Sequence, residues 1–101
     1  MRCPFKLHPL GSSFQIVYEL LGKPTTRIVS LSRLQVGQPR VHDEIVREYV
    51  SKRRLEAIQV AELPRNVFLV IDGHHRAAAA KRLGRRGIRA HVWKTKKRHA
   101  G

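Results

Sequence analysis

Hydrophobic residues gather along the chain in short runs, and polar segments rich in glycine, proline and arginine separate these runs. Five runs either alternate between apolar and polar positions or concentrate β-branched and aromatic residues, and both patterns favour β-strands. The predicted strands span residues 14–21, 27–34, 56–63, 67–71 and 88–93. Residues 67–71 are apolar throughout, which is typical of a central strand that is buried on both faces.

Two other segments have helical spacing. The first helix is predicted to begin near Asp43, which can cap it. Its apolar face holds Ile45, Val46, Tyr49 and Val50. The second helix is predicted over residues 75–83, where a run of alanines allows close packing on a sheet and Gly84 provides a stop. Tyr49 and Trp93 are expected to pack in the core.

Glycine and proline mark the predicted turns. Gly22 and Pro24 break either periodicity and predict a turn between the first two strands, and residues 64–66 predict a hairpin-like turn before the central strand. This order of elements predicts a single α/β (α+β) domain with a small mixed sheet over residues 1–93. Residues 94–101 are expected to form a basic, mobile tail.

The charge of the chain is strongly one-sided. Its 101 residues include 21 Lys and Arg against 7 Asp and Glu, which gives a net charge of +14 at pH 7. Such a balance indicates a polyanionic partner, and DNA fits better than a membrane because no stretch approaches the ~18 apolar residues of a membrane span. The surplus arginine of small basic proteins from high-GC genomes is the alternative source of the charge.

Basic residues at the end of the chain are the candidate contacts to nucleic acid. They are Lys94, Lys96, Lys97 and Arg98. Side chains of this kind bind backbone phosphates without reading sequence, so affinity should fall steeply with salt. The alternative is a solvated segment that keeps the protein soluble.

The cysteine count and the N-terminal segment indicate the cellular compartment of the protein. Cys3 is the single cysteine, which excludes an internal disulfide and a cysteine-based zinc site. The first residues are basic and contain no apolar run of useful length, so no signal peptide is expected. The sequence therefore predicts a cytoplasmic protein.

The segment VFLVIDGHHRAAAAKRLG, residues 67–84, predicts an anion site where the central strand passes into the second helix. In open α/β sheets, ligands collect beyond the carboxyl end of a strand, where the amides and dipole of the next helix favour negative charge. Gly73 has no Cβ and lets a phosphate approach the backbone, and Arg76 can hold two phosphate oxygens. His74 and His75 add ring donors. The pattern predicts phosphate capture.

Two other interpretations of this segment remain open. Asp72 and Gly73 can form an ordinary turn in which Asp72 caps the helix. A metal site would draw on the two histidines, but adjacent helical side chains diverge by about 100°. We therefore expect no intrinsic metal site, although Mg²⁺ can arrive with a nucleotide triphosphate. Asp72 would then hold a magnesium-bound water or act as a base.

Two motifs of the chain carry a resemblance to a known family. IDGHHRAAAAKRLG resembles the phosphate-binding motif of the ParB/sulfiredoxin superfamily, whose chromosome-partitioning members carry Gly-x-x-Arg where Gly73 and Arg76 stand. An earlier Gln-Pro-Arg box of the family is matched by Gln38 and Arg40 with the proline between them. The resemblance covers residues 28–93 and implies a ParB/sulfiredoxin-like domain that binds a nucleotide such as ATP, ADP or CTP, with both boxes near the phosphates.

The sequence departs from the family in two respects. Partitioning proteins continue into a helix-turn-helix DNA reader and a dimerisation segment, and the resemblance covers only their first domain. The recognition of centromere sites is therefore not expected from the resemblance. Sulfiredoxins carry a catalytic cysteine at the position of His74, and Cys3 lies far from it in sequence. Reduction of sulfinic acid is therefore not expected. The Asp-Gly-His-His-Arg sequence is similar to that of small-molecule kinases and ParB-like nuclease domains of the superfamily.

The sequence is compatible with three functions, two of which involve or allow enzymatic activity. The first is a ParB-like, nucleotide-binding and DNA-associated module, with or without weak NTPase or nuclease activity. The second is an ADP- or ATP-dependent kinase of a small molecule, related to free-serine kinases, for which Asp72 and Glu56 are the candidate catalytic carboxylates. The third is a non-catalytic nucleic-acid-binding domain whose phosphate pocket is either vestigial or used for a backbone phosphate.

Overall fold

The protein is built on a five-stranded mixed sheet with strand order β1-β5-β3-β4-β2. The computed structural model describes residues 16–36 and 42–99. The strands are β1 (Ile16–Ser30), β2 (Leu34–Val36), β3 (Ile58–Leu63), β4 (Val67–Asp72) and β5 (Gly87–His99). β1 with β5 and β3 with β4 are antiparallel, whereas β2 with β4 and β3 with β5 are parallel. The predicted α/β class with a small mixed sheet is confirmed.

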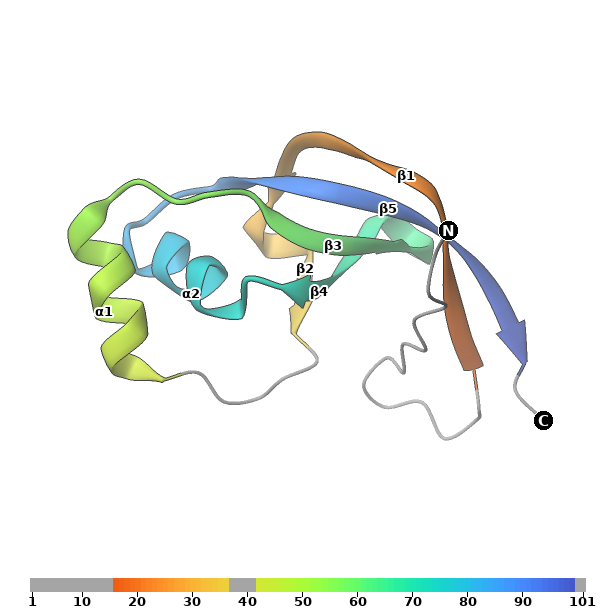
Figure 1. The fold of residues 1–101 in the computed structure, drawn as a ribbon, viewed down its shortest axis with the longest axis horizontal. Helices are drawn as coiled ribbons and strands as arrows, with labels where there is room; N and C mark the ends of the chain where they lie inside the picture. Colours follow the sequence, from red (N-terminus) through yellow and green to blue (C-terminus); the bar gives the residue numbers. More distant parts are fainter. Residues whose placement is uncertain (1–15, 37–41, 100–101) are drawn as a thin grey trace.

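Two helices complete the domain, α1 (Asp43–Lys52) and α2 (His74–Arg82), together with the short 3-10 turns η1 (Leu31–Arg33) and η2 (Pro64–Asn66). Figure 1 shows α1 and α2 together at the end of the sheet where β3 and β5 begin. The second helix was predicted to within one residue at each end. The predicted hairpin before β4 is also confirmed, and Arg65 and Asn66 both have positive φ, as in the tight turns that match the twist of paired strands.

The hydrophobic core is divided into two clusters. The larger one joins the sheet to α2 and contains Val29, Leu31, Ile58, Val60, Phe68, Val70, Ala77, Ala80, Ile88, Ala90 and Val92. The alanines of α2 are small, so the helix lies close to the strands, and Ala79 and Ala80 are fully buried. The smaller cluster contains Tyr18, Leu20, Ala61, Leu63 and Leu69, with Trp93 partly buried beside it. Because β4 contributes alternate residues to both clusters, it is buried on both faces, as its apolar sequence predicted.

β1 is a single long strand, so the predicted turn at Gly22 and Pro24 is wrong. The pairing of β1 with β5 continues on both sides of this point, with a shift of register between Leu21 and Thr25. Gly22 has a φ of +61°, which a bulge in the strand can use without a side-chain clash. The glycine and proline therefore bend a strand that long-range pairing keeps extended.

β5 continues to His99, so the predicted end of the last strand at residue 93 is wrong, and residues 94–99 are not a mobile tail. These residues pair with residues 16–21 of β1. Thr95 adds a hydrogen bond of 2.6 Å from its hydroxyl to the Glu62 carbonyl oxygen. β5 lies between β1 and β3 and does not pair with β4.

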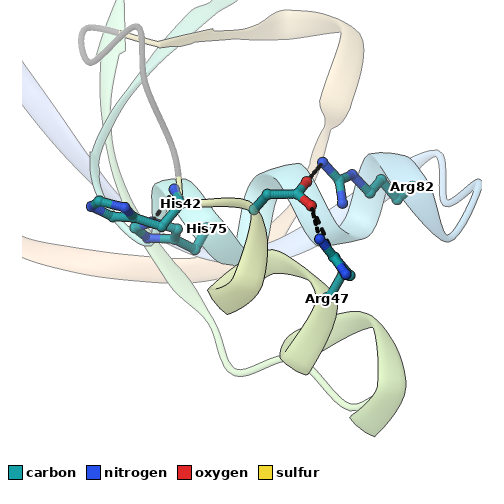
Figure 2. Close-up of polar contacts among 5 residues, drawn as sticks. His42, Arg47, His75 and Arg82 are labelled. Atoms are coloured by element: carbon teal, nitrogen blue, oxygen red, sulfur yellow. Dashed lines mark hydrogen bonds and ion pairs between the residues drawn. The ribbon is translucent and has the colours of Figure 1, made fainter.

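Asp43 ties the two helices together. It is the first residue of α1, after His42 at the cap position, so the prediction that Asp43 itself caps the helix is wrong. Its carboxylate accepts a hydrogen bond of 2.9 Å from Arg47 one turn further on and another from Arg82 of α2 (Figure 2). The Arg82 and Arg47 guanidinium groups hold the pKa of Asp43 below its usual value. The contact fixes α1 beside α2.

Candidate functional site

The candidate site lies where β4 passes into α2. β4 ends at Asp72, and Gly73 is the cap residue of α2, with φ 100° and ψ 28°. The first hydrogen bond of the helix runs from the Ala77 amide to the Gly73 carbonyl oxygen, at 2.9 Å. The amides of residues 74–76 therefore precede the helical ladder and point out of its positive end, where an anion can accept their hydrogen bonds.

Gly73 is required by the packing beneath it as well as by its positive φ. A Cβ at this position would lie 2.5 Å from Cγ2 and 2.8 Å from Cβ of Ile58, and 2.9 Å from Nη2 of Arg76. All three distances are shorter than any normal contact. The turn is therefore pressed onto β3 on one side and onto the Arg76 guanidinium on the other. This packing requirement adds to the close approach of a phosphate that the sequence suggested.

Arg76 is almost covered, with 17% of its side chain exposed. Its Nη2 lies 3.4 Å from Oδ2 of Asp72, a long contact to a carboxylate that is itself 73% exposed. Within the described part of the chain, the Nε of Arg76 is buried and has no hydrogen-bond partner. A buried donor on a permanently charged group costs free energy unless a partner reaches it. The guanidinium therefore retains a capacity to bind an anion that Asp72 does not use up.

A cavity of about 260 Å³ opens over this turn. It is lined by Tyr49, Asp72, Gly73, His74, His75 and Arg76. The structure thus brings together the five residues that the sequence placed at the strand-to-helix junction. Tyr49 of α1 was expected in the core, but it is only half-buried and lines this cavity. Its helical spacing alone does not distinguish a core position from one beside a cavity.

The two histidines are not equivalent. Burial lowers the pKa of His74, and the nearby Asp72 carboxylate opposes this effect without reversing it. Nε2 of His75 accepts a hydrogen bond of 3.0 Å from the His42 amide, and the two rings stack with centroids 5.8 Å apart (Figure 2). An accepting Nε2 leaves Nδ1 as the protonated nitrogen of a neutral ring. His75 can then offer one ring donor to a ligand, and it also holds the start of α1 beside the cavity.

Glu56 and Asp72 do not line the same cavity. Glu56 lies in the connection between α1 and β3 and lines a second cavity, of about 740 Å³. Asp72 is therefore the carboxylate found at the candidate anion site. Gln38 and Arg40 lie outside the described residues, so their predicted place at the phosphates stays a prediction.

The predicted nucleic-acid contacts are spread along the end of β5. Lys94 lies 3.9 Å from a Glu62 carboxylate oxygen, Lys96 is in register with Glu19, and Lys97 with Tyr18. Arg98 also belongs to β5. All four positions are thus held in a strand, which fixes their spacing along the sheet.

Among residues 16–36 and 42–99, no group of three or more His, Cys, Asp or Glu side chains could hold a metal ion. None of the helices in the same ranges is long and apolar enough to cross a membrane.

Solved structures show which fold this is. Sulfiredoxin from Arabidopsis thaliana is similar with a TM-score of 0.61 and 20% identity, over 70% of this chain and 86% of that chain. The C-terminally truncated chromosome-partitioning protein ParB from Caulobacter crescentus, complexed with CTP-gamma-S, has a TM-score of 0.53 and 22% identity, over 76% of this chain and 46% of that chain. A free serine kinase in complex with AMP has a TM-score of 0.61 and 14% identity, over 84% and 35%.

The chain therefore has the ParB/sulfiredoxin-like fold, as the motifs around Gly73 and Arg76 implied. It spans most of the sulfiredoxin, under half of the truncated ParB and about a third of the kinase. Neither a family sequence model nor the sequence of a curated protein matches this chain. At such identities the likeness defines the fold, and the activity has to be argued from the site.

Proposed function

We propose that this domain binds the phosphates of a nucleotide at the start of α2 and that it associates with DNA. The observation that carries the proposal is the nearly covered Arg76, whose buried Nε has no partner among the described residues and which lies beside the leading amides of α2. An anion in the cavity would accept hydrogen bonds from the leading amides and from the exposed part of the guanidinium, and a shift of the side chain would bring the covered Nε to it. The folds solved with CTP-gamma-S and AMP support a nucleotide as the source of that anion.

Several residues of the cavity have a role in this proposal. The amides of residues 74–76 and the Arg76 guanidinium bind phosphate oxygens, and a bound phosphate would raise the pKa of His74 against the effect of burial. Asp72 competes with the phosphate for Arg76 and, once displaced, is free to hold a magnesium-bound water or act as a base. Gln38 and Arg40 would complete the phosphate site. The proposed ligand is a nucleotide triphosphate with Mg²⁺.

Binding is favoured over phosphoryl transfer because of where the carboxylates lie. A small-molecule kinase needs a base beside the transferred phosphate, and Glu56 lines a different cavity from Asp72. The kinase alternative therefore rests on Asp72 alone. A weak NTPase or nuclease activity would use the same carboxylate, so Asp72→Asn should remove turnover and leave nucleotide binding in place.

DNA association follows from the charge of the chain and its placement. The net charge is +14, and Lys94, Lys96, Lys97 and Arg98 lie along one strand. Contacts of this kind go to backbone phosphates and carry no sequence preference. A cytoplasmic location, with access to both nucleotide and DNA, is part of the proposal.

The test is calorimetric titration with CTP, ATP and ADP, each with Mg²⁺. Arg76→Lys keeps the charge but loses Nε and the planar fork, and it should bind the preferred nucleotide about 10- to 100-fold more weakly, because a charge-assisted hydrogen bond contributes about 1.5–3 kcal/mol. Arg86→Lys is the matched control, since it makes the same change at an arginine that is exposed in the α2–β5 connection and lines neither of the two cavities.

Two results would refute the nucleotide proposal. One is the absence of binding of all three nucleotides to the unmodified protein, which would leave a cavity that holds only a nucleic-acid phosphate. The other is equal loss of affinity in Arg76→Lys and Arg86→Lys. Thermal unfolding of each variant separates a loss of affinity from a loss of fold.

A further inference from the structure

A second cavity, of about 740 Å³, lies between the α1–β3 connection and the paired strands β1 and β5. It is lined by Thr26, Lys52, Arg54, Leu55, Glu56, Ala57, Arg89 and His91. In the described part of the chain, this cavity and the cavity at Gly73 share no lining residue. The proposed nucleotide site does not use the residues of this cavity.

The lining of this cavity is positively charged. Lys52, Arg54 and Arg89 bring three cations against the single carboxylate of Glu56. The contact of Lys52 to Glu48, at 3.9 Å, is exposed and contributes little. Within the described ranges, the side chains of Arg54 and Arg89 form neither an ion pair nor a hydrogen bond. Cations gathered in this way repel one another, and an anionic ligand would relieve the repulsion.

The backbone that carries these cations is held in place. Arg53 ends α1 in the left-handed conformation, with φ 57°, and its carbonyl oxygen accepts a hydrogen bond from the Arg85 guanidinium. Leu55 packs against the larger core cluster. On the opposite wall, His91 Nδ1 and Thr26 Oγ1 are hydrogen-bonded at 2.8 Å. Hydrogen bonds and core packing therefore hold the backbone that carries the positive side chains.

Arg89 and Lys97 show how far this charged surface extends along β5. Ile88, Ala90 and Val92 are buried in the core, so Arg89 and His91 point to the other face of the sheet. Arg89 and Lys97 are eight residues apart in the same strand, which corresponds to about 26 Å at ~3.3 Å per residue. A mononucleotide cannot span that distance, whereas about eight base pairs of duplex can, at ~3.4 Å per step.

We propose that the cavity of Arg54 and Arg89 binds backbone phosphates of double-stranded DNA, as a second contact in addition to Lys97 at the end of β5. The inference rests on the DNA association proposed above and names a surface for it. The nucleotide site at Gly73 is separate and is not required for this contact. Because the cations meet phosphates and no base edges, the contact is independent of DNA sequence.

The test compares two double variants that each remove two positive charges. The cavity variant removes two arginines of the cavity, by Arg54→Ala and Arg89→Ala. The control variant removes two exposed arginines that line neither cavity, by Arg33→Ala and Arg86→Ala. Binding of a fluorescent 20-base-pair duplex is measured by anisotropy at a series of NaCl concentrations. The cavity variant should reduce the slope of log K against log salt by about 1.8, because each phosphate that the protein neutralises adds ~0.9 to that slope. The control variant should keep the slope of the unmodified protein.

The possible outcomes separate this inference from the nucleotide proposal. Equal slopes in the two double variants overturn the inference. So does a failure of the unmodified protein to bind the duplex, even if it binds nucleotide at Arg76. A third overturning result is loss of nucleotide binding in the cavity variant with DNA binding unchanged, which would make the cavity a nucleotide subsite. A reduced slope together with unchanged nucleotide affinity supports the inference.

Discussion

Gly73→Ala should destabilise the domain by about 2–5 kcal/mol. The positive φ of 100° costs an L-residue about 1–2 kcal/mol. The added Cβ would also lie 2.5 Å from Cγ2 of Ile58, and overpacking of a well-packed site costs typically 1–3 kcal/mol. Because a domain of this size has a total stability of about 5–15 kcal/mol, the substitution would remove a large share of it.

Gly84→Ala is the matched control for the part of the stability loss that comes from the positive φ. Gly84 also has a positive φ, of +75°, but among the described residues other than its two chain neighbours no heavy atom lies within 4 Å of a Cβ built there. Its loss should therefore be about 1–2 kcal/mol. Urea unfolding of both variants gives the comparison, and the excess loss in Gly73→Ala, about 1–3 kcal/mol, measures the overlap with Ile58 and Arg76.

A double-mutant cycle with Ile58→Ala checks the cause of that excess. Ile58→Ala removes the Cγ2 atom that the new Cβ would meet, so the combined variant should lose at least about 1 kcal/mol less than the sum of the two single losses. Equal losses in Gly73→Ala and Gly84→Ala, or strict additivity in the cycle, would refute the view that the turn is pressed onto β3.

Two further substitutions test the contacts that position the site. Asp43→Asn should lower the free energy of unfolding at neutral pH, because the folded protein holds the pKa of Asp43 below its ordinary value of 3.8. That stabilisation is complete above the pKa of the unfolded chain and is lost as the pH falls through the pKa of the folded protein. The difference in unfolding free energy between the variant and the unmodified protein should therefore disappear in acid. A difference in urea unfolding that stays constant with pH contradicts this. His75→Phe keeps a ring against His42 but removes the Nε2 acceptor, and it should cost about 1 kcal/mol in the same assay; an unchanged midpoint would show that water replaces the contact.

The strand-to-helix unit was predictable because its signals are local. An apolar run defines β4, Gly73 supplies the turn and Gly84 follows the end of α2, all within eighteen consecutive residues. The hairpin at residues 64–66 was predictable for the same reason. Propensity and tertiary structure agree in this part of the chain.

Pairing between the two ends of the described chain overrode the local signals elsewhere. Gly22 and Pro24 form a typical turn sequence, yet β5 pairs with β1 on both sides of them. The lysines of residues 94–97 show no hydrophobic alternation, and their strand depends on a partner far away in sequence. Local propensity cannot report a contact of that kind.

The site was predictable in its composition and less so in its architecture. Gly73 and Arg76 do lie together, because both belong to one turn of chain. The Ile58 side chain beneath the glycine comes from β3, and Tyr49 in the cavity wall and the His42 contact to His75 come from α1 and its cap residue. Their positions follow from how α1 and β3 pack on α2, which no short motif specifies.

The position of β5 in the sheet has a consequence for how the protein forms during synthesis. β5 is the last of the five described strands to be synthesised, yet it lies between β1 and β3. Until the ribosome has released residues 87–99, β1 lacks its partner and one edge of β3 stays open. Contacts of such large sequence separation form slowly, and open strand edges favour aggregation. The sheet therefore closes only after β5 has emerged, and until then the nascent chain carries unpaired strand edges.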